Sequence, residues 1–288
     1  MAVVLAATDA WTGRRRRVAE LRGRQGFARQ LLDFYGALLS VQEKAFDEAA
    51  QAAPPAESLV AYVAQVVLPS IVDVSVATGP DRLRAEVLRR VAADDGTDVV
   101  RGWLNGGVQP DVDRYLARAS LGPVLEALGP AAGAQCQGPR DARHCPDCGG
   151  PPQLSYTARA ADDLATGPRR LLCARCGAGW GFARATCPGC GEDSSAKLSF
   201  FSEHGTASGE RGSVVRGLPA GPDPVRDRAV FPHMRIEACD SCRRYLLGID
   251  LAAEPAAVPL VDEMAAIPLD LFARERGYTK IITNLMGF

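Results

Sequence analysis

The chain has 288 residues, of which 47% are apolar and 23% are charged, and its formal net charge is −1 at pH 7. These values suit a globular protein of one or two domains. The near-neutral charge excludes a bulk field that would draw the whole chain to nucleic acid or to an acidic membrane. Residues 1–7 are apolar but too few for a signal peptide or a membrane span. We therefore expect no membrane span and a reducing, cytoplasmic compartment, where cysteines act as ligands more often than as disulfides.

The first 135 residues contain no cysteine and show helical patterns. Apolar residues recur with a period near 3.6 over residues 27–46, which predicts an amphipathic helix. Pro54 and Pro55 end it, and a second helix is expected from about Glu57. The later part of that helix, residues 68–76, is rich in β-branched residues and contains Pro69, so we expect a buried, kinked helix there.

Two further helices complete the predicted N-terminal half. Residues 79–81, with the sequence Gly-Pro-Asp, mark the start of a third helix, and Pro110 opens a fourth, which Gly122-Pro123 can interrupt. Asp95-Gly96 and Asn105-Gly106-Gly107 are predicted turns. The pattern predicts a helical array, and it carries no phosphate loop or histidine–carboxylate pair that would indicate catalysis.

The second half has short segments separated by glycine, proline and cysteine. Residues 129–140 are typical of a linker, and residues 203–232 are rich in glycine, proline and charge, which predicts a long insertion. A C-terminal helix is expected from Pro259 to about Arg276, followed by a tail. Six short strands are predicted, at residues 154–158, 170–172, 180–184, 197–202, 234–238 and 245–250.

Eight of the nine cysteines form four Cys-x-x-Cys pairs. This spacing lets the chain turn back so that both sulfurs face one point, about 2.3 Å from a metal ion. Three pairs are followed directly by glycine, which suits the left-handed position of a metal knuckle. A single pair of this kind can also be a thioredoxin-type redox site, and two-residue loops make poor disulfide staples. The pairs are Cys145/Cys148, Cys173/Cys176, Cys187/Cys190 and Cys239/Cys242.

Sequential pairing gives two four-thiolate sites, because interleaved pairs would make the chain cross between modules. The first predicted site is Cys145, Cys148, Cys173 and Cys176, and the second is Cys187, Cys190, Cys239 and Cys242. Four thiolates in a tetrahedron suit zinc and iron alike, and the spacing does not decide between them.

The remaining cysteine and the histidines have weaker roles in this interpretation. Cys136 lies in the linker without a partner and is expected to be incidental. His144 precedes Cys145 and can donate to a sulfur, whereas His204 and His233 are expected to be solvated loop residues.

These residues, in this order, resemble the FdhE family, accessory proteins of respiratory formate dehydrogenase. The resemblance rests on three stretches and covers residues 143–285. The first two are residues 145–191, with three cysteine pairs and Trp180, and residues 197–202 together with 235–246, which hold the fourth pair. The third is the ending, Val261-Asp-Glu-Met-Ala-Ala-Ile-Pro-Leu-Asp-Leu-Phe272 followed by Gly277-Tyr-Thr-Lys.

The resemblance implies an α+β fold, with an N-terminal helical array followed by two rubredoxin-like or zinc-ribbon-like modules of short antiparallel strands. It also implies a cytoplasmic, non-enzymatic role in maturation, in which the protein binds the catalytic subunit of formate dehydrogenase. Iron is reported for the family, so the resemblance favours iron in the two sites, although zinc fits the same ligands. Two departures are the long insertion and Leu247, which stands where the family usually has a lysine.

We expect residues 1–135 to form the helical domain, 136–186 and 187–258 the two metal modules, and 259–288 a C-terminal helix and tail. Rigid knuckles display the side chains beside them, so candidate client-binding residues are Arg175, Trp180, Arg184 and Arg243. The structural alternative is that Trp180 packs the first module and that the arginines are solvated.

Two other functions compete with the accessory role. An iron–thiolate protein could transfer electrons, and a zinc-ribbon module could bind nucleic acid in a salt-dependent way. The neutral charge and the lack of basic residues interleaved with aromatic ones disfavour nucleic acid. The sequence leaves the oligomeric state open, a homodimer included.

Overall fold

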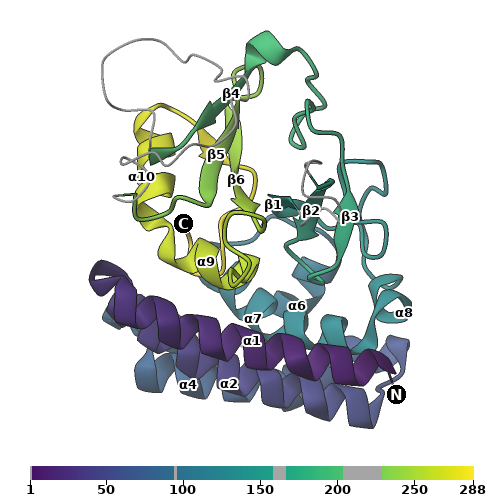
Figure 1. The fold of residues 1–288 in the computed structure, drawn as a ribbon. Helices are drawn as coiled ribbons and strands as arrows, with labels where there is room; N and C mark the ends of the chain where they lie inside the picture. Colours follow the sequence, from purple (N-terminus) through teal and green to yellow (C-terminus); the bar gives the residue numbers. More distant parts are fainter. Residues whose placement is uncertain (1, 94–95, 158–166, 204–228) are drawn as a thin grey trace.

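The computed structural model describes residues 2–93, 96–157, 167–203 and 229–288, with side chains from residue 10 onward. The predicted insertion at 203–232 falls largely outside these ranges, and so does His204. Figure 1 shows a layer of long helices beneath a sheet of short strands, with a C-terminal pair of helices beside the sheet.

The N-terminal half is helical, as the periodicity predicts, and Leu32, Leu38 and Ile71 are fully buried inside it. The sequence prediction missed three helices, because α1 has no clear apolar stripe, α6 is short, and the four-residue α8 lies within the predicted linker 129–140. The described helices are α1 (Ala2–Arg24), α2 (Arg29–Ala52), α3 (Leu59–Tyr62), α4 (Leu68–Thr78), α5 (Asp81–Val91), α6 (Thr97–Leu104), α7 (Asp111–Leu128) and α8 (Pro130–Gly133).

The second predicted helix is continuous but irregular. A π-helical turn, Val63–Val67, separates α3 from α4 just before Pro69, where proline lacks the N–H that a regular α-turn needs. By length and composition alone, residues Ala56–Thr78 could cross a membrane. In the structure this segment packs against α2 and α7, and a core helix of a globular protein has the same composition.

Helix α7 runs through Gly122-Pro123 without interruption. Proline at position 123 cannot donate to the carbonyl of Ala119, four residues earlier. The side chain of Gln42 on α2 donates to that carbonyl instead, at 2.9 Å. A neighbouring helix thus satisfies the freed acceptor, and this compensation allows the helix to continue.

The strands of both predicted modules join in one sheet. Its strand order is β3-β2-β1-β6-β5-β4, and the short β7, which is not part of this order, pairs with β6. The strands β1–β3 pair antiparallel, and so do β4–β6. A parallel pair between β1 and β6 joins the halves, with Leu154 opposite Leu247, and β7 also pairs parallel with β6. The strands are β1 (Pro152–Thr157), β2 (Arg169–Cys173), β3 (Gly179–Gly181), β4 (Leu198–Phe201), β5 (Met234–Cys239), β6 (Arg244–Asp250) and β7 (Thr279–Lys280).

The sequence predicts one C-terminal helix, and this is wrong in one respect, because the segment forms two helices. Helix α9 (Pro259–Ala265) ends before Ala266, and α10 (Ile267–Glu275) begins directly after it. Pro268 stands in the first turn of α10, where a missing N–H costs nothing, and this favours a new helix start.

A buried ion pair connects the helical layer to the C-terminal half. Arg17 on α1 binds Asp262 on α9 through Nη2 and Oδ1, 2.6 Å apart, and both side chains are almost fully buried. The His233 ring nitrogen Nε2 lies 2.9 Å from the same oxygen. Burial alone would raise the pKa of Asp262, but the hydrogen bonds from His233 and Arg17 hold it below its usual value. The expectation that His233 is solvated is therefore wrong.

A second buried ionic cluster joins α9, α10 and β7. Lys280 lies 2.8 Å from Glu263 and 3.0 Å from Asp270, and all three side chains are buried. The Tyr245 hydroxyl on β6 donates to Asp270 at 2.8 Å. Burial raises the pKa of Glu263, and Lys280 offsets part of that rise. These contacts fix the C-terminal helices against the edge of the second module.

Candidate metal centres

The first four-cysteine group lies in the β1–β2–β3 half of the sheet, in the loop before β1 and at the turn between β2 and β3. Cys145 and Cys148 occupy the loop before β1, whereas Cys173 ends β2 and Cys176 lies in the turn to β3. Each pair forms a knuckle. In the first, the Gly149 amide donates to the Cys145 carbonyl at 2.8 Å, and in the second the Gly177 amide donates to the Cys173 carbonyl at 3.2 Å.

The second group repeats this arrangement in the β4–β5–β6 half. Cys187 and Cys190 lie in the loop after β3, Cys239 ends β5, and Cys242 lies in the turn to β6. The Gly191 amide donates to the Cys187 carbonyl at 2.9 Å. Both groups therefore use one knuckle from a loop and one from a strand end.

The sulfur atoms converge in both groups, all within 4.8 Å of one another. In the first group, Cys145 and Cys176 have sulfurs 3.6 Å apart, and those of Cys148 and Cys173 are 3.3 Å apart. In the second group, the corresponding cross-pair distances are 3.8 Å for Cys187–Cys242 and 3.7 Å for Cys190–Cys239. Metal–sulfur bonds of about 2.3 Å in a tetrahedron place sulfurs about 3.8 Å apart, so this donor set can hold a zinc or iron ion.

Glycine supplies the left-handed backbone at three knuckles, and arginine does so at the fourth. Gly149, Gly177 and Gly191 have φ angles of +68°, +72° and +86°, and Arg243 has φ +55°. A side chain in this conformation is strained, by about 1–2 kcal/mol. Arg243 is held there by its own contacts, because Nη1 binds Asp240 at 3.0 Å and Nη2 donates to the Arg276 carbonyl at 2.6 Å.

The two groups differ in burial. Every cysteine of the first group is buried and belongs to the main core. In the second group Cys190 is exposed and Cys242 is half-buried, and Cys187 and Cys239 pack with Leu198 in a small separate cluster. Solvent and reagents can therefore reach one edge of the second centre directly.

Burial raises the pKa of Cys173 in the first group and of Cys187 in the second. A bound cation has the opposite effect, because it stabilises the thiolate form. Metal binding at either centre would thus release protons, and its affinity would fall at acid pH.

Neither His144 nor Cys136 belongs to either four-cysteine cluster of the described residues. His144 does not contact a sulfur: its Nδ1 lies 2.7 Å from Asp141, and this hydrogen bond lowers the pKa of Asp141 to about 2. Cys136 is buried rather than a surface linker residue, and burial raises the pKa of its thiol to about 11. A thiol in this state is a poor nucleophile.

The four candidate client-binding residues fall into two classes. Arg175 and Trp180 are buried, and the Trp180 indole donates to the Ala142 carbonyl at 3.0 Å, which agrees with its alternative role in packing the first module. Arg184 and Arg243 are exposed. Leu247, at the position where the family usually has lysine, is fully buried in β6. A role in client binding stays a prediction for all four, and the exposed arginines are the ones a partner can reach.

Comparison with known proteins supports the resemblance. Residues 225–286 match the family model described as FdhE, C-terminal domain. A protein FdhE homolog from Aquifex aeolicus is 26% identical over 71% of this chain and 62% of its own length. One from Pseudomonas aeruginosa is 32% identical over 49% of this chain and 38% of its own length. The sequence alignments thus span less than two thirds of either relative.

The fold also has a solved counterpart. The crystal structure of the FdhE protein from Pseudomonas aeruginosa matches with a TM-score of 0.61 at 21% identity, over 96% of this chain and 95% of that one. At this identity the match shows the shared fold alone. The C-terminal family model, the curated homologues and the ordered cysteine pairs agree with it, and together these findings support the resemblance to the FdhE family.

Proposed function

We propose that this chain is a non-enzymatic, cytoplasmic accessory protein that binds the catalytic subunit of a respiratory, molybdopterin-dependent formate dehydrogenase during its maturation. The observation that carries the proposal is the combination of two converging four-cysteine clusters and an FdhE C-terminal domain in one chain. The eight clustered cysteines are the proposed ligands of two metal ions, with iron favoured by the resemblance and zinc compatible with the same donors.

The proposed role of the metals is first a structural one. Each half of the sheet has only short strands, and β3 has three residues. Small hairpins of this kind bury too little apolar surface to be stable alone, and metal binding supplies the missing folding free energy. The four domains predicted from the sequence are retained in this proposal, although the two modules share one sheet.

The proposed client surface lies near the second centre. Arg243 belongs to the knuckle of Cys242, and its guanidinium lies 4.0 Å from the Tyr278 ring centroid. Arg184 precedes the Cys187 knuckle and is exposed. The two candidates beside the first centre, Arg175 and Trp180, are buried and are therefore not part of this surface.

Co-purification tests the proposal. The tagged chain should capture a formate dehydrogenase catalytic subunit, and should not capture an unrelated molybdopterin enzyme. Arg184→Glu and Arg243→Glu should weaken capture. Arg82→Glu is the matched control, because Arg82 is an exposed arginine on α5 in the helical layer. Failure of the unmodified chain to bind any such subunit would refute the proposal, and equal loss in all three variants would refute the proposed surface.

One observation favours the electron-transfer function as a second candidate. The exposed thiol of Cys190 brings the edge of the second centre to the surface, as an electron-transfer site requires. Anaerobically purified protein should then show ferric–thiolate absorption that a donor bleaches reversibly. A colourless zinc protein that still binds the catalytic subunit would exclude this function and leave the accessory role intact.

A further inference from the structure

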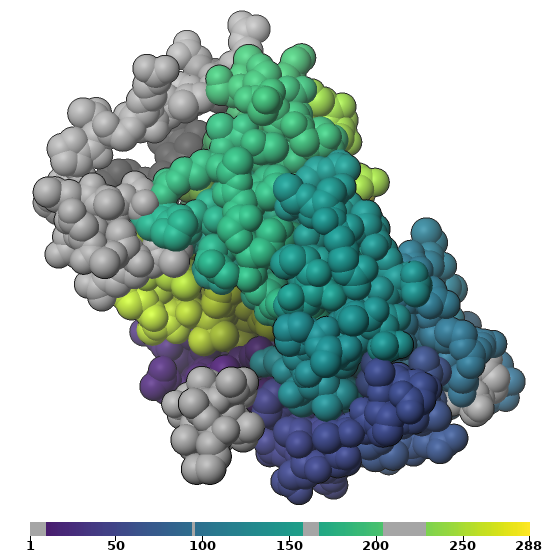
Figure 2. All heavy atoms as spheres, turned by 90° about the vertical axis from the view of Figure 1, so that its right-hand side faces the viewer, coloured from purple at the N-terminus to yellow at the C-terminus, as the bar shows by residue number. Residues whose placement is uncertain are grey.

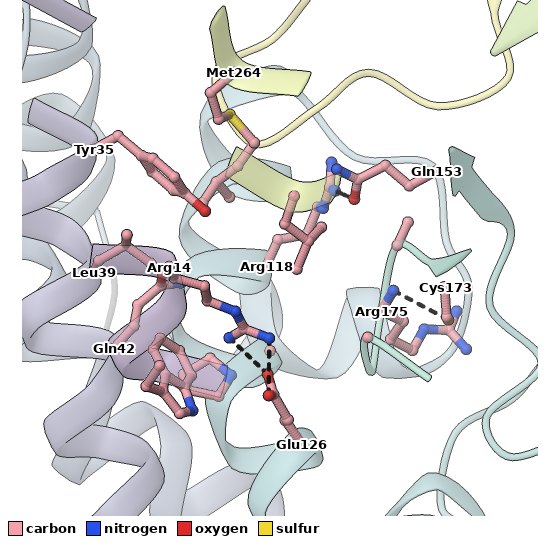
Figure 3. Close-up of a pocket in the computed structure, with 17 residues that line it drawn as sticks. Arg14, Tyr35, Leu39, Gln42, Arg118, Glu126, Gln153, Cys173, Arg175 and Met264 are labelled. Carbon is pink, nitrogen blue, oxygen red and sulfur yellow. Dashed lines mark hydrogen bonds and ion pairs between the residues drawn. The ribbon is translucent and has the colours of Figure 1, made fainter. Parts of the chain in front are cut away.

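A cavity separates the helical layer from the first metal centre. Its walls come from α1, α2 and α7 on one side, and from the Cys173–Gly177 knuckle and α9 on the other. Figure 3 shows Arg14, Glu126 and Arg118 around this space, with Cys173 and Arg175 at its far side. Its volume is about 80 Å³. A buried water needs roughly 10–15 Å³ on this measure, so the cavity holds a few waters or a ligand of a few non-hydrogen atoms.

The unpartnered polar atoms in this lining are all donors. The Trp11 Nε1, Arg118 Nε and Arg175 Nε groups have no hydrogen-bond partner among the described residues. The three residues are only 2%, 6% and 4% exposed. A buried donor without a partner costs about 1–3 kcal/mol, so three of them in one lining favour an occupant that accepts hydrogen bonds.

The charges of the lining also favour an occupant that accepts hydrogen bonds. Glu126 is its only carboxylate, and Arg14 already binds both of its oxygens, at 2.9 and 3.0 Å. Arg118 donates only to uncharged acceptors, the Thr283 carbonyl and the Gln153 side chain, each at 2.5 Å. Burial lowers the pKa of Arg118 to about 10, and the charge of Glu263 opposes part of this fall.

Arg175, like Arg118, donates to uncharged acceptors. Its Nη1 donates to the backbone carbonyls of Gln137 and Cys148, at 3.0 and 2.7 Å. Both Arg118 and Arg175 lie 5.7 Å from the ring centroid of Trp103. The thiolate of Cys173 offsets part of the positive charge of Arg118.

We propose that this cavity binds a small oxyanion, a carboxylate or a phosphate of a few non-hydrogen atoms, between the helical layer and the first metal knuckle. The anion accepts from Trp11 Nε1 and from the buried guanidinium of Arg118, and it balances the excess positive charge of the lining. The proposal does not rest on the role in formate dehydrogenase maturation, because it uses only residues that line the cavity.

Indole resonances give a direct test in the full-length, metal-loaded protein. The chain has three tryptophans, and the Trp11 Nε1–H signal is the one that disappears in Trp11→Phe. Titration with sodium acetate or sodium phosphate at constant ionic strength should shift this signal saturably, with a dissociation constant in the millimolar range or tighter. Comparison of acetate with phosphate tells which oxyanion class binds.

Two variants make the test specific. Arg118→Gln should abolish the shift, and Glu126→Gln, which removes the only carboxylate of the lining, should tighten binding several-fold, a gain that misfolding cannot mimic. Asp113→Asn is the matched control, because Asp113 forms a half-buried pair with Arg90 in the helical layer, outside this lining. Equal tightening in Asp113→Asn would overturn the proposal, because the change in net charge alone would then explain the gain in affinity. The absence of a saturable Trp11 shift with either anion would also overturn it, because water alone would then fill the cavity.

Discussion

The two four-cysteine centres have the same ligands and spacing but occupy different environments. All four cysteines of the first centre lie in the main hydrophobic core. The second centre has an exposed Cys190 and a half-buried Cys242. In Figure 2 the teal part of the chain lies directly on the blue helical layer, and the green part lies farther from that layer. Identical local chemistry thus becomes a buried centre in one half of the sheet and an accessible centre in the other.

This difference separates two uses of a tetrathiolate centre. Where the centre is part of the core, its loss removes both the metal and the packing around it. Where it stands at the periphery, its loss should stay local, and its ligands can meet a reagent or a partner. The predictions below test this division.

The largest expected effect is the loss of the first centre. Replacing Cys145 and Cys148 with serine should remove one metal equivalent and unfold the first module, because structural zinc contributes apparent binding free energies of about 10–16 kcal/mol in zinc-finger peptides. The matching change at Cys187 and Cys190 should also remove one metal equivalent, with a much smaller fall in the thermal midpoint of the whole chain. Metal analysis and calorimetry measure both.

The control for this pair is Cys136→Ala. Cys136 is buried but lies outside both clusters, so this variant should keep two metals and cost only about 1 kcal/mol of unfolding free energy. Retention of two metals after loss of either cysteine pair would contradict metal ligation by that pair.

The second prediction concerns metal release. A chelator or thiol reagent should empty the second centre first, at least about tenfold faster than the first, because buried ligands react only after local opening. Alkylation followed by mass spectrometry should find Cys190 and Cys242 modified before any cysteine of the first centre. Simultaneous release from both centres would show that burial does not protect the first.

A smaller effect is expected at the buried Arg17–Asp262 pair. Asp262→Asn should cost about 3 kcal/mol near neutral pH, because it leaves a buried guanidinium without its carboxylate. The folded pKa of Asp262 lies below the usual 3.8, so the stabilisation is complete above that value and is lost as the pH falls through the folded pKa. The deficit relative to the parent protein should therefore shrink below about pH 4.

Urea unfolding of both proteins across this pH range measures the deficit. The control is Asp113→Asn, which breaks a pair with exposures of 18% and 16% and should cost only about 1 kcal/mol. Metal release from the second centre should not change in Asp262→Asn, since the pair joins α1 to α9. A deficit independent of pH would mean that the carboxylate charge does not stabilise the fold.

The smallest effects should come from the knuckle turns. Gly177→Ala should cost about 1 kcal/mol, because a side chain is strained at φ +72°, although an added Cβ would meet only Glu126 Oε2, at 3.8 Å. Arg243→Gly should be nearly neutral, because relief of the same strain offsets the loss of the contacts to Asp240 and Tyr278. Unfolding free energies of the two variants measure this, and a large cost for Arg243→Gly would show that its contacts outweigh the strain.

Much of the fold was predictable because its signals are local. Periodic apolar residues predicted the main helices, and alternation between glycine-rich turns predicted all six larger strands. Helix α1 was missed because its hydrophobic residues do not gather on one face, and α6 because eight residues are too few for periodicity to show. The break at Ala266 depends on how Pro268 starts a new helix within an otherwise continuous pattern.

The buried charges were not predictable in the same way. Asp262, Glu263 and Asp270 appear in the sequence as the polar positions of an amphipathic helix, yet all three are buried. Their partners are Arg17 and Lys280, far away in the chain or in the tail. The only local sign of this burial was that acidic residues stand next to the apolar Val261 and Met264. That sign does not identify the residue with which each acid pairs.

The sequence by itself determined the local chemistry: which cysteines pair, where the knuckles turn, and that two centres follow a helical array. These properties depend on residues a few positions apart, whose geometry the backbone fixes. Only the tertiary structure decided that the two modules join through parallel β1 and β6, that one centre is buried and the other accessible, and that buried arginines surround a cavity beside the first. Such properties arise from contacts between residues distant in sequence, which no local pattern records.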